Sequence, residues 1–380
     1  MSKVKIKTLT AVHIGSGNLL QKNMDYVVYK DEDEDSFIGI IDPKMILSLI
    51  GEEHLNDWLL AIERKDDTRQ LVSRYNKKAT VYDYISRSIT DFTEGKNLGT
   101  LKECLHNGMG LPYIPGSSIK GAIRTAILAT ITQEKGTALE HLMSDKKGKL
   151  SAKGVESALF GSTANDDIFR FLQVGDAYFE EGCEVAYRMV NLNVRKKDSL
   201  MDDSKPQAVE AISDDFESEF NMKISKEHYE YASTHGGNLK ELPAGMDSLP
   251  SLFKLVNGHT RKLVKEEIAY WQEIEEEKEK EGAEDYISSM RQILKEINQC
   301  AEGKECVLRI GHASGWRFIT GAWSEMFMTE DWKDDPKNMF HKIVWASRPK
   351  ASQYQEYDFP KSRRIDYEGL LLGFVKLSLI

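Results

Sequence analysis

The residues best placed to do chemistry lie in short glycine-containing segments, and one of these leads into a helix. Residues 113–124 read YIPGSSIKGAIR, in which Pro-Gly marks a turn before an apolar repeat of period four. The N–H groups at a helix start are unpaired and attract phosphate, and Ser117 and Ser118 can add hydroxyl donors. Lys120 and Arg124 are four residues apart, so they share one helix face. The segment predicts a phosphate-binding helix start, with an ordinary capped helix carrying exposed cations as the alternative.

A second segment, HIGSG at residues 13–17, follows a stretch that alternates as a half-buried strand does. Gly15 and Gly17 allow backbone conformations that other residues avoid, and Ser16 between them offers a hydroxyl. His13 could act as a general acid or base in RNA cleavage, or it could serve only as a structural or RNA-contacting residue. Both interpretations stay open at this point.

A third segment, RIGHASGWR at residues 309–317, combines cations, glycines, a histidine and a tryptophan after a short strand. Close backbone approach and an aromatic ring suit a sugar-phosphate chain with a stacked base. An ordinary glycine turn near a tryptophan is the alternative. The predicted contact residues are Arg309, His312, Ser314, Gly315 and Arg317.

A basic run, KSRR at residues 361–364, adds Arg363 and Arg364 as candidate RNA contacts, although solvated surface is the common fate of such runs. No Walker A loop is present, because Lys120 precedes Gly121 rather than following it. The four cysteines form no CxxC pair, and no histidine stands at zinc-ligand spacing. We therefore expect reduced thiols, no metal and no cofactor.

The elements that must position these segments alternate between strands and helices. Strands are expected over residues 3–13, 25–29, 37–41, 169–178, 185–193, 306–310 and 370–380. Helices are expected over residues 43–89 with breaks, after residue 116, and over 261–299 with a break near Gly282. Residues 198–207 form a polar stretch before a helix-rich segment, and 242–256 suggest loop and strand.

This order predicts an α+β fold of two ferredoxin-like (RRM-like) units with helical insertions. The N-terminal unit would span residues 1–200, and the C-terminal unit 201–380 with its insertion at about 258–300. Tyr286, Met290, Ile293 and Ile297 form a narrow apolar stripe that predicts a packing seam rather than a cofactor site.

Net charge alone does not decide the partner of this chain. The formal charge is −10, but the acidic run at residues 31–35 carries −5 and residues 273–285 carry −6. The remainder is therefore close to neutral, and screening limits the reach of such acidic blocks to roughly 8 Å. The longest apolar run, residues 370–380, is too short to span a bilayer as a helix. We expect a cytoplasmic protein with no membrane partner.

Taken together, the motifs resemble the RAMP superfamily of CRISPR-associated proteins. The resemblance rests on VHIGSG at 12–17, YIPGSSIKGAIRTAIL at 113–128, LRIGHASGW at 308–316, PKSRR at 360–364 and LLLGFVKLSLI at 370–380. The late glycine loop and the closing strand, 308–316 and 370–380, are similar to the capping subunit of the type III-A (Csm) effector complex. The resemblance implies RRM-like units that bind guide RNA (crRNA) at its 3′ end. It also implies association with Csm backbone subunits and other effector subunits, and guide maturation through recruited cellular nucleases rather than through catalysis by this chain.

One segment departs from this simple account. MDYVVYKD at residues 24–31 is similar to the part of the backbone subunit that carries its target-cleaving aspartate, and Asp25 occupies that position. A structural aspartate at a strand start is the ordinary interpretation. A metal-independent endoribonuclease using His13 or Asp25 is the alternative function.

Overall fold

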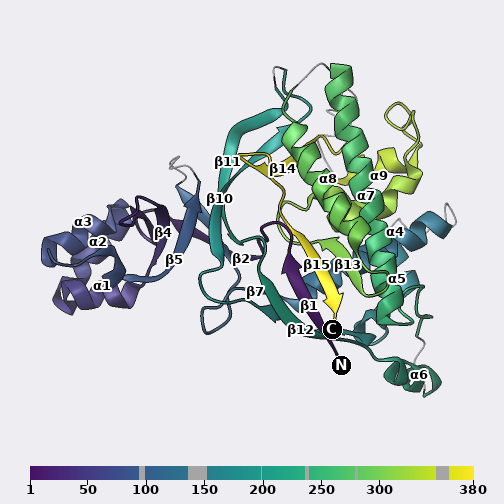
Figure 1. Ribbon diagram of the computed structural model, residues 1–380, viewed down its shortest axis with the longest axis horizontal. Coiled ribbons are helices and arrows are strands. Elements are labelled where there is room, and N and C mark those ends of the chain that lie inside the picture. The colour runs from purple at the N-terminus through teal and green to yellow at the C-terminus, as the bar shows by residue number, and fades with distance from the viewer. Residues whose placement is uncertain (94–98, 136–151, 198, 236–238, 279–280, 348–358) are drawn as a thin grey trace.

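The computed structural model describes residues 1–93, 99–135, 152–197, 199–235, 239–278, 281–347 and 359–380 (Figure 1). Its strands are β1 (Ser2–Thr8), β2 (Gly15–Gln21), β3 (Tyr26–Lys30), β4 (Ser36–Ile41), β5 (Ile85–Phe92), β6 (Thr100–Cys104), β7 (Tyr113–Ile114), β8 (Leu172–Val174), β9 (Ala177–Tyr178), β10 (Glu184–Asn193), β11 (Met201–Ile212), β12 (Glu217–Ile224), β13 (Glu305–Arg309), β14 (Ser362–Asp366) and β15 (Phe374–Leu379). Its α-helices are α1 (Pro43–Ile50), α2 (Leu55–Arg64), α3 (Thr68–Tyr75), α4 (Gly116–Lys135), α5 (Lys153–Phe160), α6 (Lys226–Thr234), α7 (Leu249–Lys278), α8 (Glu284–Gln299) and α9 (Met339–Ser347). Short helical turns are η1 (Glu52–His54), η2 (Val81–Asp83), η4 (Ile168–Phe171), η5 (Arg317–Gly321, a π-helical turn) and η6 (Ala322–Phe327).

The smaller sheet has the antiparallel order β13-β15-β1-β12-β8. β1 forms as predicted because Val4 and Ile6 are fully buried while the alternating lysines Lys3, Lys5 and Lys7 point to the other face. Within this sheet, β15-β1-β12-β8 is the strand order of a ferredoxin-like unit, with α4 before β8 and α7 and α8 before β15. The unit joins both ends of the chain, since Val4 pairs with Phe220 on one side and Leu379 on the other.

The larger sheet has the order β2-β6-β11-β10-β5-β4-β3, and β14 pairs with the second half of β10. It is mixed, because β5 and β6 run parallel to β10 and β11. This order is not that of a second ferredoxin-like unit. The α+β class is therefore confirmed, while only one ferredoxin-like strand order occurs among the described strands. The expected boundary at residue 200 falls within the β10–β11 pair, and both sheets take strands from both halves of the chain.

Three local predictions differ from the structure. The helical stretch expected up to residue 89 ends earlier, because residues 85–92 form β5 between β4 and β10. Residues 201–207 of the polar stretch form the first half of β11, which is exposed or half-buried except at Asp202, while the second half, from Ala208 to Ile212, is buried in the sheet. Residues 249–256 are helical rather than extended, since Leu249, Leu252, Phe253 and Val256 form one buried helical stripe.

Helices cover one side of the smaller sheet, and α7 and α8 lie beside each other there (Figure 1). Ile119, Ile123, Ile127 and Ile131 of α4 join Val4 and Ile6 in one hydrophobic core. The predicted stripe Tyr286, Met290, Ile293 and Ile297 is buried in a neighbouring core, as expected for a packing seam. At the far end of the molecule α1, α2 and α3 pack against β3, β4 and β5 (Figure 1). Among the described residues, no helix is both long and apolar enough to cross a membrane.

Candidate nucleic-acid interface

The two glycine loops predicted from sequence meet in the folded chain. The amide of His312 donates to the carbonyl of His13 at 2.9 Å, and the amide of Gly373 donates to Ala11 at 2.8 Å. Gly311 has φ +74°, and a Cβ atom there would lie 2.4 Å from the His13 carbonyl oxygen. Gly373 has φ +93°, and its Cβ would lie 2.3 Å from the Ile310 carbonyl oxygen. We call residues 13–17, 311–315 and Gly373 the glycine junction, because only glycine permits these approaches.

Two histidines form the interior of the glycine junction. The rings of His13 and His312 meet edge to face, with centroids 5.4 Å apart. His13 is 3% exposed and its Nδ1 faces the backbone carbonyl of Glu210, so Nδ1 carries the proton. Burial lowers the pKa of His13, and it lowers the pKa of His312 to about 4. Both rings are therefore neutral at pH 7, and His13 is placed as a support of the loop, not as an exposed acid or base.

Lys102 and Arg364 supply positive charge at the glycine junction. After burial, the charges of Lys102 and Arg364 are further causes of the lowered pKa of His312. Burial also lowers the pKa of Lys102, and the charge of Arg364 adds to this effect, so the two cations repel each other. Arg364 donates to the Lys205 carbonyl at 3.4 Å, and neither cation forms an ion pair with any residue in the described part of the chain. The Asp202 carboxylate attracts Arg364, but no carboxylate of the described residues offsets the burial and the repulsion that lower the pKa of Lys102, so the pair of cations favours an anionic ligand.

An aromatic pair lies on the same face of the larger sheet as Lys102. The strand register pairs Lys102 of β6 with Val209 of β11, Val209 with Tyr187 of β10, and Tyr187 with Phe92 of β5. These four side chains therefore lie in one row on the same face of the sheet. The rings of Phe92 and Tyr187 stack with centroids 5.7 Å apart and planes 21° apart, and Phe92 is 53% exposed. This face thus offers a partly exposed aromatic surface of the kind on which RNA bases stack.

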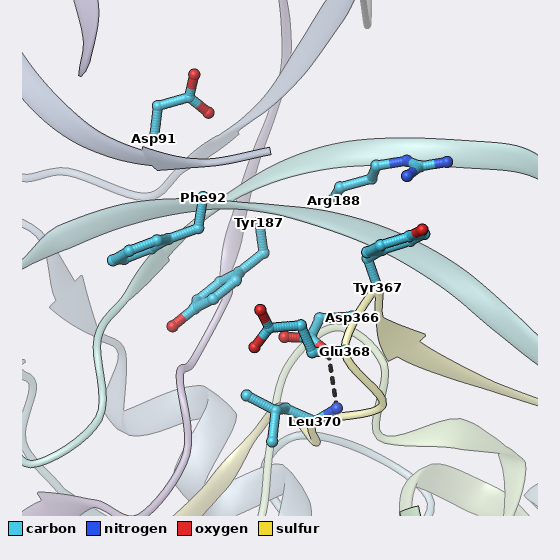
Figure 2. A pocket seen from close by; sticks show the side chains of 8 residues that line it. All are labelled: Asp91, Phe92, Tyr187, Arg188, Asp366, Tyr367, Glu368 and Leu370. Carbon is cyan, nitrogen blue, oxygen red and sulfur yellow. Dashed lines mark hydrogen bonds between the residues drawn. The ribbon is translucent and has the colours of Figure 1, made fainter. Parts of the chain in front are cut away.

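A cavity of about 300 Å³ adjoins the aromatic pair (Figure 2). It lies where β5 and β14 leave a gap along the edge of β10, since β5 pairs with residues 185–187 and β14 with residues 189–193. Figure 2 shows Arg188 beside the ring of Tyr367, and the guanidinium carbon is 4.4 Å from the ring centroid. Asp366 accepts from the Leu370 amide, and burial raises the pKa of this carboxyl to about 6. The cavity therefore combines aromatic, cationic and acidic groups.

Three predicted RNA contacts lie inside the protein instead. Arg363 is 6% exposed and forms two 2.7 Å hydrogen bonds with the carboxylate of Glu267 on α7. Arg317 pairs with the same carboxylate at 3.2 Å and also with two further glutamates. Arg309 is 4% exposed and donates to the Leu372 carbonyl. Their guanidinium groups are buried and bonded to internal partners, which argues against the predicted RNA contacts of Arg309, Arg317 and Arg363.

The predicted helix start is correctly located, but it is not free. The amide of Gly116 donates to the carboxylate of Asp176 at 2.8 Å. Arg124 pairs with Glu156 and Asp167 and lies over the rings of Phe160 and Phe169. An anion there would compete with carboxylates of the protein itself, so the expected phosphate cradle is occupied by internal acids.

The remaining predicted contacts around the helix start and the glycine junction differ in availability. Ser117 is exposed, whereas Ser118 and Lys120 are half-buried on α4. Ser16 donates to Glu103 at 2.9 Å, and Ser314 donates to the Gly311 carbonyl at 2.8 Å. The serine hydroxyls of the two loops therefore stabilise the glycine junction in this structure.

Gly15, Gly17 and Gly315 differ in the space around them. A Cβ on Gly15 would lie 3.0 Å from His13 Nε2, so this glycine lets the loop approach the histidine ring. Gly17 and Gly315 have positive φ with no neighbouring atom within 4 Å of a Cβ. These two glycines permit a left-handed backbone conformation and are not needed for a close contact.

Asp25 closes a turn between β2 and β3. Its carboxylate accepts from the amide of Gln21 at 2.7 Å, and its own amide donates to the Gln21 carbonyl at 2.8 Å. The hairpin predicted around the acidic run forms as β3 and β4. This geometry gives Asp25 a structural function that needs no catalysis.

Comparison with known proteins identifies the class to which this fold and interface belong. The model of the RAMP superfamily matches residues 5–318, so the chain belongs to the RAMP superfamily. The chain is also similar to a protein of Methanocaldococcus jannaschii described as "CRISPR system Cms protein Csm5", with 28% identity over 203 residues. That match covers 51% of this chain and 47% of the relative, so it spans about half the length of each.

Two solved structures share the fold over nearly the whole chain. One is a chain of a Csm–crRNA–target RNA ternary complex of a type III-A CRISPR-Cas system, with TM-score 0.70, 19% identity and full coverage of both chains. The other is Csm5 of T. onnurineus, with TM-score 0.64, 17% identity and coverage of 98% of this chain and 99% of that one. The resemblance expected from the sequence motifs is thereby confirmed.

Proposed function

We propose that this chain is a guide-RNA-binding subunit of a type III-A CRISPR effector complex. It holds the 3′ end of the crRNA and supports maturation of the guide in antiviral defence, and it does not cut RNA itself. Membership in the RAMP superfamily and similarity to Csm5 proteins support this assignment. Csm backbone subunits and other effector subunits are the proposed protein partners, with cellular nucleases as transient ones.

The observation that carries the proposal is the glycine junction beside Lys102 and Arg364. The glycine junction fixes the two loops against each other. Lys102 and Arg364 form no ion pair among the described residues, although the carboxylate of Asp202 attracts Arg364. Phe92 and Tyr187 lie in the same cross-strand row as Lys102 and suit an unstacked base. Phosphate contacts at the cations and stacking on the rings together account for binding that is not tied to sequence.

The double variant Lys102→Ala/Arg364→Ala should bind guide RNA about 10- to 100-fold more weakly at low salt, because two phosphate contacts are lost. The slope of log affinity against log salt should fall by roughly 0.7 for each lost contact with single-stranded RNA. Filter binding of labelled guide RNA at several salt concentrations measures both quantities.

Lys254→Ala is the matched control, since Lys254 is an exposed lysine that pairs with Glu302. Its affinity and salt slope should equal those of the unmodified chain. A double variant at Lys102 and Arg364 with an unchanged salt slope would remove these residues from the RNA path.

Absence of catalysis is tested separately with labelled repeat and target RNA. We expect the purified chain to leave both RNAs intact in EDTA, because His13 is buried and neutral and Asp25 is held by the Gln21 amide. Cleavage that persists in EDTA and disappears in His13→Ala or Asp25→Ala would instead support the endoribonuclease.

A further inference from the structure

A buried cluster of potential metal ligands lies beneath the first glycine loop. The ligand atoms of His106, Glu184 and Glu210 all lie within 4.8 Å of one another. Their side chains are 12%, 3% and 0% exposed. Glu210 neighbours Val209 in β11 and so points to the face opposite the row that contains Lys102. The cluster is therefore separate from the proposed RNA surface.

The hydrogen bonding of His106 leaves a lone pair inside the cluster. Nδ1 of His106 lies 3.0 Å from the carbonyl oxygen of Cys104, which can only accept, so Nδ1 carries a proton. Nε2 then faces Glu184 Oε1 at 3.2 Å and Glu210 Oε1 at 3.7 Å. Arg87 Nη1 already donates to Glu210 Oε1, so the unsatisfied contact is the one between His106 Nε2 and Glu184 Oε1. This buried contact requires a positive species, either a second imidazole proton or a cation.

Backbone amides orient both carboxylates toward that place. The Gly182 amide donates to Glu184 Oε2 at 3.1 Å, and the Cys104 amide donates to Glu210 Oε2 at 2.8 Å. Glu184 thus presents its Oε1 atom to His106, whereas Glu210 Oε1 faces His106 and also accepts from Arg87 Nη1. A histidine that donates to a backbone carbonyl, beside carboxylates that are themselves hydrogen-bonded, is the usual outer-shell arrangement of protein metal ligands.

Distance and charge both suit a divalent ion of the first transition series. Zinc bonds of about 2.0–2.2 Å to nitrogen and oxygen place tetrahedral ligands about 3.3–3.6 Å apart, close to the two separations above. Glu103, Glu184 and Glu210 carry three negative charges here, and Arg87, which pairs with Glu103 and Glu210, cancels one. Three carboxylates against one guanidinium leave a charge of −2 to balance a divalent ion.

An access route exists on the solvent side. Glu184 and Arg87 line a cavity of about 580 Å³ that also contacts Tyr82 and Met109, both of which are exposed. An ion can therefore reach the cluster without unfolding of the sheet. It would leave at least one coordination position for water, because the protein supplies three ligands.

We propose that His106, Glu184 and Glu210 bind one divalent transition-metal ion that braces the glycine junction. The ligands come from the segment just after β6, the start of β10 and the inner half of β11, so no short sequence spacing reveals them. The connection to the junction is direct, since the Glu210 carbonyl bonds His13 and the Leu105 amide donates to Ile14 at 2.8 Å. The ion fixes these strands relative to one another, independently of RNA.

The test uses the full chain, stripped with chelator and titrated with Zn²⁺ by calorimetry. We expect one saturable site and a Tm that rises with Zn²⁺ concentration. Glu184→Gln and His106→Ala should each weaken binding at least tenfold. X-ray absorption of the unmodified chain with one equivalent of Zn²⁺ should show one imidazole and oxygen donors, a result that does not depend on whether the variants fold.

His54→Ala is the control, because His54 forms a similar but more exposed pair with Asp57, in which Nδ1 lies 3.5 Å from the carboxylate. Its Zn²⁺ affinity should equal that of the unmodified chain. No saturable binding, or equal binding by Glu184→Gln, would overturn the proposal and assign a proton on His106 as the positive species.

Discussion

Replacing Glu267 with alanine should lower the free energy of unfolding by about 3–5 kcal/mol, the range for removal of one partner from a buried ion pair. Glu267 is fully buried on α7 and accepts from Arg363, Arg317 and Tyr286. Arg363 would lose its carboxylate partner and remain buried as an uncompensated charge. Urea unfolding of the purified chain, followed by circular dichroism, measures the change.

Glu266→Ala is the adjacent control. Glu266 pairs with Arg317 at 3.0 Å and with Lys262 at 3.7 Å, but it is partly exposed, so its loss should cost at most about 1 kcal/mol. Equal costs at both positions would contradict the assignment of Glu267 as the central acceptor of the core.

The same group makes stability depend on pH. Burial alone would raise the pKa of Glu267, but attraction to Arg363 and Arg317 and the Tyr286 hydrogen bond outweigh it and lower the pKa to about 2. A depressed carboxyl pKa contributes stability that is fully present above about 4.5 and is lost as pH falls toward 2. The contribution is about 3 kcal/mol, and Glu267→Gln should abolish this part of the acid transition.

The strand pattern explains why the predicted arginine pair divides. Arg363 and Arg364 are neighbours in β14, and successive residues in a strand point to opposite faces. Arg363 therefore enters the core, while Arg364 lies on the opposite face, where its charge adds to burial in lowering the pKa of His312. The basic run was visible in the sequence, but the strand that separates its two members was not recognised, so both arginines were expected to contact RNA.

The sequence-based prediction did not include Glu267 or Lys102, and only Glu267 has a local sequence pattern that indicates its role. Glu267 occupies a helical core position beside Val264, Ile268 and Trp271, and an acid within such a stripe is a detectable sign of a buried pair. Lys102 carried no such signal, because its position in the sheet depends on pairing with Val209, more than one hundred residues away. The glycine loops were predictable because their function resides in local backbone freedom, whereas the partners of each cation are set by the tertiary fold.

Gly311→Ala should lower the free energy of unfolding by about 3 kcal/mol and weaken guide RNA binding at least tenfold. Left-handed backbone costs a side-chain-bearing residue about 1–2 kcal/mol, and the new Cβ would also lie 2.4 Å from the His13 carbonyl oxygen. Relief of that contact must break the hydrogen bond between His312 and His13 or separate the two loops. Urea unfolding and filter binding report the two effects.

Gly315→Ala tests the cost of a left-handed backbone without a steric contact. Gly315 lies in the same loop with φ +79°, and no atom lies within 4 Å of the position of a Cβ. It should cost only about 1 kcal/mol, the conformational part alone, and leave guide affinity within about twofold. If both variants lose stability but keep affinity, contact between the two loops serves the fold alone. If both variants lose the same amount of guide RNA affinity, RNA binding depends on backbone conformation at 311–315. It then does not depend on the close contact between Gly311 and the His13 carbonyl.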